Sequence, residues 1–200
     1  MSRVMKMVLI VVSIIILSFG IGIITSYNSL VRKEFEIERT YAVIVNRLNE
    51  RQATITQLLG TVEGLAAHEQ AIIDSITDAR SAYSQANQAN DMEGMISADS
   101  AYVSGFGSLL VVIENYPQIA TSDAFKDLMV TIVSIEGGLF VARKDYNDAI
   151  ADYNMNLRLF PKSIVARMFS FTSTDAYWRL APGAGDIPAI DFGVYANPQT

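Results

Sequence analysis

The single histidine of this 200-residue chain, His68, is the first place to look for a metal ligand or a proton-transfer group. Glu69 follows it directly, and Glu63 precedes it by five residues. A helical di-metal site needs carboxylates from facing helices together with Glu-x-x-His pairs, and the sequence has no such pair. Five positions turn a helix by about 500°, so Glu63 and His68 do not share a face. We therefore predict a surface histidine and no metal site.

The remaining composition argues against other kinds of chemistry. The absence of cysteine excludes disulfides, thiolate zinc sites and cysteine nucleophiles. We find no glycine-rich phosphate loop, no Ser/His/Asp set and no HExxH motif. The formal charge of −6, without a cluster of Lys and Arg, argues against nucleic-acid binding. We expect no enzymatic activity, no cofactor, no nucleic-acid partner and no small-molecule substrate.

Two Tyr-Asn pairs repeat at a spacing that places them on one helical face. Tyr146 and Asn147 are followed seven residues later by Tyr153 and Asn154, which is two helical turns. The tyrosines belong to an apolar stripe, and the asparagines lie at its edge. Two interpretations remain open: these residues fix the register of a helical bundle through hydrogen bonds, or they form a binding strip for a partner helix.

A second candidate surface combines basic and aromatic residues between Lys162 and Arg179. Its aromatic members are Phe169, Phe171, Tyr177 and Trp178. This composition is typical of an element at a membrane interface. The alternative is a turn that caps the end of the bundle.

The element that must position these residues begins with a membrane anchor. Met7 to Thr25 reads MVLIVVSIIILSFGIGIIT, which is 19 uncharged residues. As a helix it would be about 28 Å long, enough to cross the hydrocarbon core of a bilayer. Residues 18–20 make a tolerable signal-peptide cleavage site, but the apolar run continues through Ile24, which favours a retained signal anchor.

The charges around this anchor bear on its orientation. Arg3 and Lys6 precede it, whereas Arg32, Lys33 and Arg39 follow closely, so the positive-inside rule is nearly balanced. The short N-terminus carries only positive charge, and this favours an extracytoplasmic bundle on a single-pass anchor in the membrane.

Beyond the anchor, apolar residues recur every three or four positions, which predicts amphipathic helices. The stripe runs from Tyr27 to Tyr83 without proline, so one long helix is allowed, with a bend or break in residues 50–64 where Gly60 and Gly64 weaken it. Residues 85–98 are predicted to connect it to a third helix at about 99–116, and a fourth helix covers 123–160.

The fold class that follows is all-α: an N-terminal transmembrane helix and an elongated antiparallel bundle of the up-and-down, four-helix type with coiled-coil-like packing. We divide the chain into a short basic N-terminus (1–6), the transmembrane helix (7–25), the helical bundle (26–172) and an irregular tail (173–200).

Several separated stretches carry a family resemblance. They are Tyr27–Val31 (YNSLV), Leu59–Glu69 (LGTVEGLAAHE), Thr77–Arg80, Leu109–Pro117 (LLVVIENYP), Ala142–Asn154 (ARKDYNDAIADYN), Phe160–Pro161 and Pro188–Phe192 (PAIDF). In order and spacing they resemble the LemA family of bacterial membrane-anchored helical proteins. The sequence departs from the family pattern in Glu50–Leu58, where Ala53 replaces an acid and Thr56 replaces a proline.

The resemblance implies a helical bundle on one anchor in the bacterial inner membrane. It implies little biochemistry, because the family has no agreed activity and some relatives are linked to the formation of membrane organelles or to envelope processes. We therefore expect a scaffold or interaction protein that contacts the lipid bilayer and organises membrane or self-assembles as a homo-oligomer. The alternative is an accessory binding module that presents a helical surface to a membrane protease or transporter.

Overall fold

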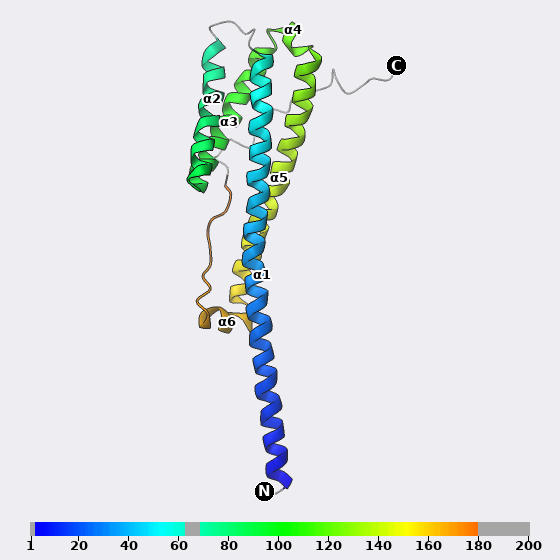
Figure 1. Cartoon of the computed structure of the whole chain (residues 1–200), viewed down its shortest axis with the longest axis vertical. Coiled ribbons are helices and arrows are strands. Elements are labelled where there is room, and N and C mark those ends of the chain that lie inside the picture. Colours follow the sequence, from blue (N-terminus) through cyan, green and yellow to red (C-terminus); the bar gives the residue numbers. More distant parts are fainter. Residues whose placement is uncertain (1–2, 63–68, 180–200) are drawn as a thin grey trace, which may run out of the picture. The chain divides into compact units, whose positions relative to one another are not determined.

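The computed structural model describes residues 3–62 and 69–179, and their regular structure is entirely helical (Figure 1). This confirms the all-α fold class. In chain order the helices of these residues are α1 (Arg3–Thr61), α2 (Gln70–Gln88), α3 (Met92–Ile113), α4 (Pro117–Ala120), α5 (Asp123–Arg158) and α6 (Lys162–Met168).

Helix α1 begins with a stretch that leaves its apolar side chains uncovered. Leu17, for example, is 67 % exposed, although an apolar side chain this large normally packs against protein or lipid. The hydroxyls of Ser13 and Thr25 donate to the carbonyls of Leu9 and Ile21, one turn earlier, so these polar groups are satisfied within the helix. By length and composition this part of α1 is a candidate membrane span.

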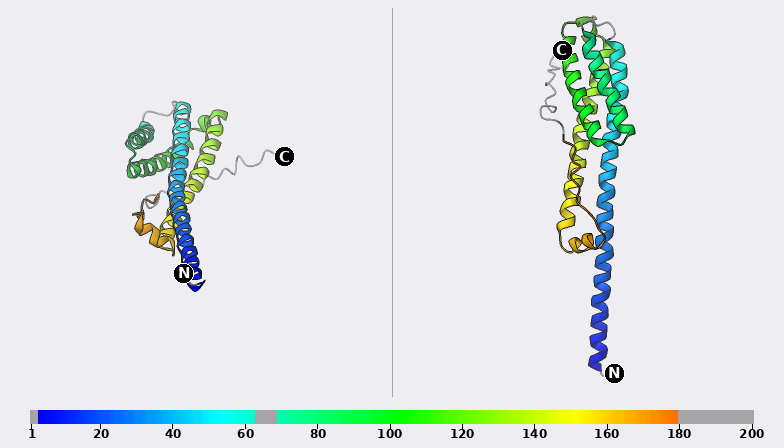
Figure 2. Two further views of the ribbon diagram at one scale, coloured as in Figure 1. Left: turned by 60° about the horizontal axis from the view of Figure 1, so that its bottom comes forward. Right: turned by 90° about the vertical axis from the view of Figure 1, so that its left-hand side faces the viewer.

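The chain divides into two compact units, which we describe separately. The first contains α1 as far as Asn46 together with Leu139–Tyr177, which includes the second half of α5, all of α6 and the segment after it. Its buried side chains come from α1 and α5 at helical spacing, among them Leu30, Ile44 and Ile150. The rings of Tyr41 and Tyr146 meet with centroids 5.9 Å apart, and Lys33 forms an ion pair with Asp152. Helix α6 lies beside α1, where Val165 and Ala166 pack against Leu30, as can be followed in Figure 2.

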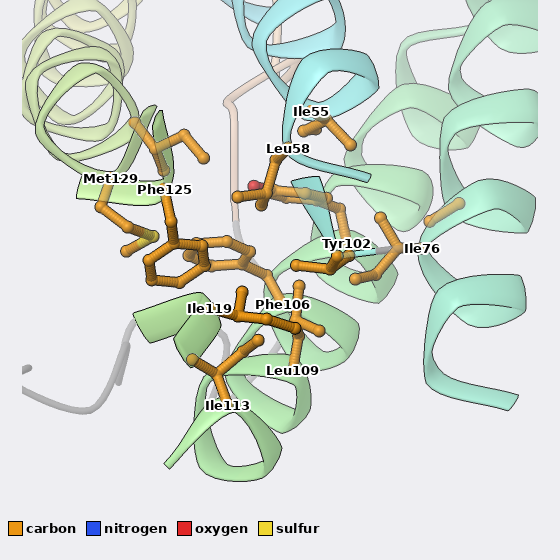
Figure 3. Close-up of a cluster of buried hydrophobic side chains, with 13 residues drawn as sticks. Ile55, Leu58, Ile76, Tyr102, Phe106, Leu109, Ile113, Ile119, Phe125 and Met129 are labelled. Carbon is orange, nitrogen blue, oxygen red and sulfur yellow. The ribbon is translucent and has the colours of Figure 1, made fainter. Parts of the chain in front are cut away.

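The second unit contains the end of α1 from Arg47, helices α2, α3 and α4, and the start of α5 as far as Gly138. Its core is a cluster of aliphatic and aromatic side chains from all of these helices, as Figure 3 shows. Helices α2 and α3 approach closely at Gly105, where an added Cβ would lie 3.1 Å from Cγ1 of Ile76. Helix α3 is apolar enough to pass as a membrane span, and its burial in this core accounts for that apolar character.

The connection predicted at residues 85–98 is wrong in extent. Helix α2 continues to Gln88, and α3 begins at Met92 rather than near Asp99. The reason is a cap: the carboxylate of Asp91 accepts a hydrogen bond from the backbone N–H of Gly94 at 3.0 Å, which satisfies one of the free donors at the helix start. The third helix also ends at Ile113, before the predicted Tyr116, and the short α4 follows it.

The first long helix continues through most of the region where a bend was allowed. Helix α1 includes Gly60 and ends at Thr61, and residues 63–68, which hold His68, lie outside the described residues. At the position where the family pattern has proline, the hydroxyl of Thr56 donates to the carbonyl of Gln52 at 2.9 Å, and the helix is uninterrupted. The fourth predicted helix corresponds to α5, which ends at Arg158.

Candidate functional site

The Tyr-Asn pairs of α5 hold an irregular segment of the same chain, residues 171–177. The hydroxyl of Tyr153 donates to the carbonyl of Thr172 at 3.1 Å, and that of Tyr146 donates to the carbonyl of Ala176 at 2.8 Å. Between them Asn154 bonds Thr174 twice: its amide donates to the carbonyl at 2.8 Å, and its oxygen accepts the backbone N–H at 3.1 Å. These contacts satisfy backbone groups of a segment that has no helix or sheet partner of its own.

The two tyrosines are nearly inaccessible. Tyr146 is 2 % exposed and Tyr153 is 3 % exposed, while Asn147 and Asn154 are half-buried beside them. Burial raises the pKa of Tyr146 to about 12, and it also raises the pKa of Tyr153. Three of the four predicted residues are thus brought onto one segment of the same chain. The register role and the binding strip for a partner helix both stay predictions.

The predicted interface residues lie in different surroundings. The ring of Phe169 is 48 % exposed and stands 4.8 Å from that of Tyr27, and Phe171 stands 5.6 Å from the same ring. Tyr177 is half-buried and Trp178 is only 3 % exposed. The aromatic pair Phe169 and Phe171 therefore surrounds Tyr27, two residues after the uncharged stretch of α1 ends.

A buried charge cluster in the second unit is a feature that sequence reasoning missed. The guanidinium of Arg51 is fully buried and bonds Asp99, also fully buried, at 2.6 Å and Glu136 at 3.1 Å. Its central carbon lies 4.1 Å from the centroid of the Tyr102 ring. One cation thus serves two carboxylates and an aromatic face.

The electrostatics of this cluster keep Arg51 charged. Burial alone would lower the pKa of Arg51, but the carboxylates of Asp99 and Glu136 outweigh burial and raise it. Burial raises the pKa of Tyr102. The arrangement ties α1, α3 and α5 together as an ionic lock. Among residues 3–62 and 69–179, no group of three or more His, Asp or Glu side chains is arranged to hold a metal ion.

A signal for the cluster was present in the sequence. Asp99 lies between Met95 and Tyr102 at helical spacing, so it occupies the apolar face of α3. A carboxylate on a buried face requires a partner. Nothing in the sequence pairs Glu136 with Arg51, which lies 85 residues earlier.

Comparison with known proteins identifies the family. The sequence profile of the LemA family matches residues 40–192, which is more than half of the chain. The chain belongs to the LemA family. The matched LemA region contains the whole Arg51 cluster and the α5 residues that hold residues 171–177, whereas the candidate membrane span precedes it.

Curated relatives include two magnetosome proteins of Paramagnetospirillum magneticum, MamQ 1 and MamQ 2, each 32 % identical over 98 residues. Magnetosome protein MamQ of Magnetospirillum gryphiswaldense is 28 % identical over the same length. In each case the alignment covers 49 % of this chain and 35 % of the relative, so the likeness spans about a third of those proteins. Family and relatives indicate a membrane-associated helical protein of the LemA type.

The outer face of α5 in this LemA chain carries an apolar stripe. Val130, Val133 and Phe140 are 69 %, 47 % and 71 % exposed, and Val141 is 53 % exposed. Gly137 lies among them, and an added Cβ there would meet nothing within 4 Å. The spacing of three or four residues places all five on one side of the helix.

Proposed function

We propose that this chain is a single-pass, membrane-anchored helical scaffold that assembles with copies of itself through the outer face of α5. The observation that carries the proposal is the exposed stripe of Val130, Val133, Phe140 and Val141. Apolar side chains gathered on one helix face favour a partner, because removing their surface from water lowers the free energy.

Gly137 supports a helical partner in particular. A glycine inside a helix costs about 1 kcal/mol relative to alanine. None of the described residues occupies the space that its Cβ would take, so packing among them does not require a glycine there. A small residue between apolar side chains allows a second helix to approach closely.

The anchor favours a second copy as that partner. Chains held by the same α1 span in one bilayer are parallel and at equal height, so their α5 stripes meet in register without further adjustment. Val130, Val133, Gly137 and Phe140 then follow the alternating three and four spacing of a parallel two-helix seam.

We place the protein in the bacterial inner membrane, with residues 7–25 as the span, 26–172 as the bundle and the bundle extracytoplasmic. The relatives are named as magnetosome proteins, and from this we infer a role in organising membrane for the present chain as well. The proposal assigns no reaction to the chain.

Cysteine crosslinking in native membranes tests the assembly. Because the sequence contains no cysteine, each variant carries a single thiol at a known position. Gly137→Cys places a thiol at the centre of the stripe, and disulfide formation requires Cα atoms within about 7 Å. We expect a disulfide-linked dimer, weakened when Phe140→Gln is added. Thr131→Cys is the matched control, because Thr131 is exposed on α5 away from the stripe.

Equal dimer yields from the two cysteine variants, or none from either, would contradict self-assembly. A crosslinked product of Gly137→Cys that contains a different membrane protein in fixed ratio would instead support the accessory module for a protease or transporter.

A further inference from the structure

Helix α6 is apolar on both of its faces. On the inner face Val165 and Ala166 are buried against Leu30 of α1. On the outer side Ile164 and Met168 are 45 % and 60 % exposed, and side chains four residues apart share a helix face. Phe160, in the turn that precedes the helix, is 81 % exposed. The outer face of this short helix is therefore apolar, and the described residues leave it uncovered.

The position of α6 along α1 determines how far the outer face of α6 lies from the proposed membrane span. Ile23, which belongs to the uncharged stretch of α1, packs against the cluster formed by Leu30, Val165 and Ala166. From Thr25 to Leu30 the helix rises only about 8 Å. The headgroup region on each side of a bilayer is about 5 to 8 Å thick. When α1 spans the bilayer, α6 is therefore at the level of the lipid headgroups.

The aromatic contacts agree with this level. Tyr27, 38 % exposed, meets Phe169 and Phe171 with ring centroids 4.8 and 5.6 Å away. Tyrosine with one apolar and one wet side is typical of membrane interfaces. Trp178 is buried and does not belong to this surface.

The local charge points to the kind of lipid. The whole chain has a formal charge of −6, but residues 157–171 contain Arg158, Lys162 and Arg167 and no carboxylate. Lys162 is engaged by the side chain of Asn156, whereas Arg158 and Arg167 are exposed. Basic residues beside an apolar helix face bind the phosphates of anionic lipids.

We propose that α6 is a membrane foot: Phe160, Ile164, Met168 and Phe169 insert into the headgroup region of the leaflet from which α1 emerges, and Arg158 and Arg167 bind anionic phospholipid. The foot requires that α1 spans the bilayer, but it does not depend on self-assembly through α5.

Depth-dependent fluorescence quenching in the full-length protein tests the foot. Single cysteines carry an environment-sensitive label, and the vesicles contain lipids with spin-label quenchers, with or without about a third of phosphatidylglycerol in phosphatidylcholine. Met168→Cys reports on the foot and Ile14→Cys on the span. Ala42→Cys, at an exposed residue of α1 in the same unit, is the matched control, and it lies about 18 Å of helix beyond Leu30.

We expect Met168→Cys to be quenched by headgroup-level quenchers and Ile14→Cys by deep ones, with Ala42→Cys unaffected. Removing phosphatidylglycerol, or adding R158Q/R167Q, should weaken quenching at Met168→Cys, because each basic residue near an anionic surface is worth about fivefold in binding. Circular dichroism of the labelled variants confirms that they are folded.

Three outcomes overturn the proposal. Quenching of Met168→Cys no stronger than that of Ala42→Cys shows that the outer face of α6 is in water. A blue-shifted but unquenched label shows that protein covers it. Failure of Ile14→Cys to be quenched removes the span, and the foot with it, while leaving the crosslinking test of α5 to decide self-assembly independently.

Discussion

At the scale of single residues, Arg51 joins three helices of the second unit, because its buried guanidinium bonds Asp99 of α3 and Glu136 of α5. A fully buried guanidinium and a fully buried carboxylate lose their hydration, and their attraction only roughly compensates for that loss. The pair therefore contributes little net stability, but breaking it leaves a charge without compensation. Its effect is on register, because only one alignment of α1, α3 and α5 brings Asp99 and Glu136 to Arg51.

We predict that Arg51→Met lowers the free energy of unfolding by about 3 to 5 kcal/mol, because Asp99 is left buried without its cation. The double variant R51M/D99L should recover most of this loss, since an apolar pair of similar size needs no compensation. Thermal unfolding followed by circular dichroism measures both. Lys144→Met, which breaks an exposed ion pair with Asp148, is the control and should leave the melting temperature unchanged. A double variant as unstable as the single one would contradict this account.

Tyr146 gives a prediction at high pH. Its folded-state pKa is raised from 10.0 to about 12 by burial, so above pH 10 the unfolded chain loses this proton while the folded chain keeps it. Stability is therefore fully present below pH 10 and falls between pH 10 and about 12, by at most about 1.4 kcal/mol per pH unit from this group.

Tyr146→Phe should melt earlier than the parent at pH 8, because the hydrogen bond to Ala176 is lost. Its melting temperature should then fall less steeply than that of the parent from pH 10 to 12. Parallel slopes for the two proteins would show that Tyr146 does not titrate in this way.

At the scale of elements, the periodicity of apolar residues predicted the helices well and their ends less well. The fourth predicted helix, residues 123–160, agrees with α5 to within a few residues at both ends. The polar composition of residues 85–98 concealed the start of α3, although Met95 and Ala98 are buried there at helical spacing. The aspartate cap at Asp91 was the local signal that placed the boundary.

Residues 171–177 could not be assigned from their own sequence. They have no regular structure, and their position is set by side chains of α5 that lie up to 30 residues earlier. The periodicity showed that Tyr146, Tyr153 and Asn154 share a face, but a repeat on a face does not reveal what covers it. For the same reason the sequence left both the register interpretation and the binding-strip interpretation open.

We predict that Asn154→Ala releases this segment while leaving the helices intact. Two hydrogen bonds to Thr174 are lost, and each is worth about 1 kcal/mol. Chymotrypsin should then cut after Phe171 or Tyr177 faster than in the parent, with little change in helix content by circular dichroism. Asn46→Ala, at an exposed asparagine of α1 in the same unit, is the matched control and should not alter cleavage. Cleavage at the parental rate in both variants would show that Asn154 does not hold residues 171–177 in place.

At the scale of the whole molecule, the distribution of charge around the span of α1 determines which way the protein is inserted. Arg3 and Lys6 precede the span, and Arg32 and Arg39 follow it on exposed positions. Translocating the short basic N-terminus is opposed by the positive-inside rule. The uncharged run of residues 7–25 correctly predicted a long apolar helix at this end of the chain. The charges on its two sides are nearly balanced, and this is why its orientation does not follow from inspection.

We predict that a C-terminal alkaline phosphatase fusion is active and that a green fluorescent protein fusion is dark, as expected for an extracytoplasmic bundle. R32Q/R39Q should strengthen this result by removing positive charge from the translocated side, and R3Q/K6Q should shift part of the population to the reverse orientation. Bright fluorescence with inactive phosphatase in the parent would show the opposite orientation.

The path of residues 171–177 has a practical consequence for handling the protein. After α6 the chain turns back along α5, from the level of Tyr153 at Thr172 to that of Tyr146 at Ala176. By Ala176 it has climbed about 18 Å of helix above Arg158, the last residue of α5. With α6 at the headgroups as proposed, an affinity tag or reporter joined beyond Tyr177 starts with clearance from the lipid, and attaching it does not obstruct the proposed contact of α6.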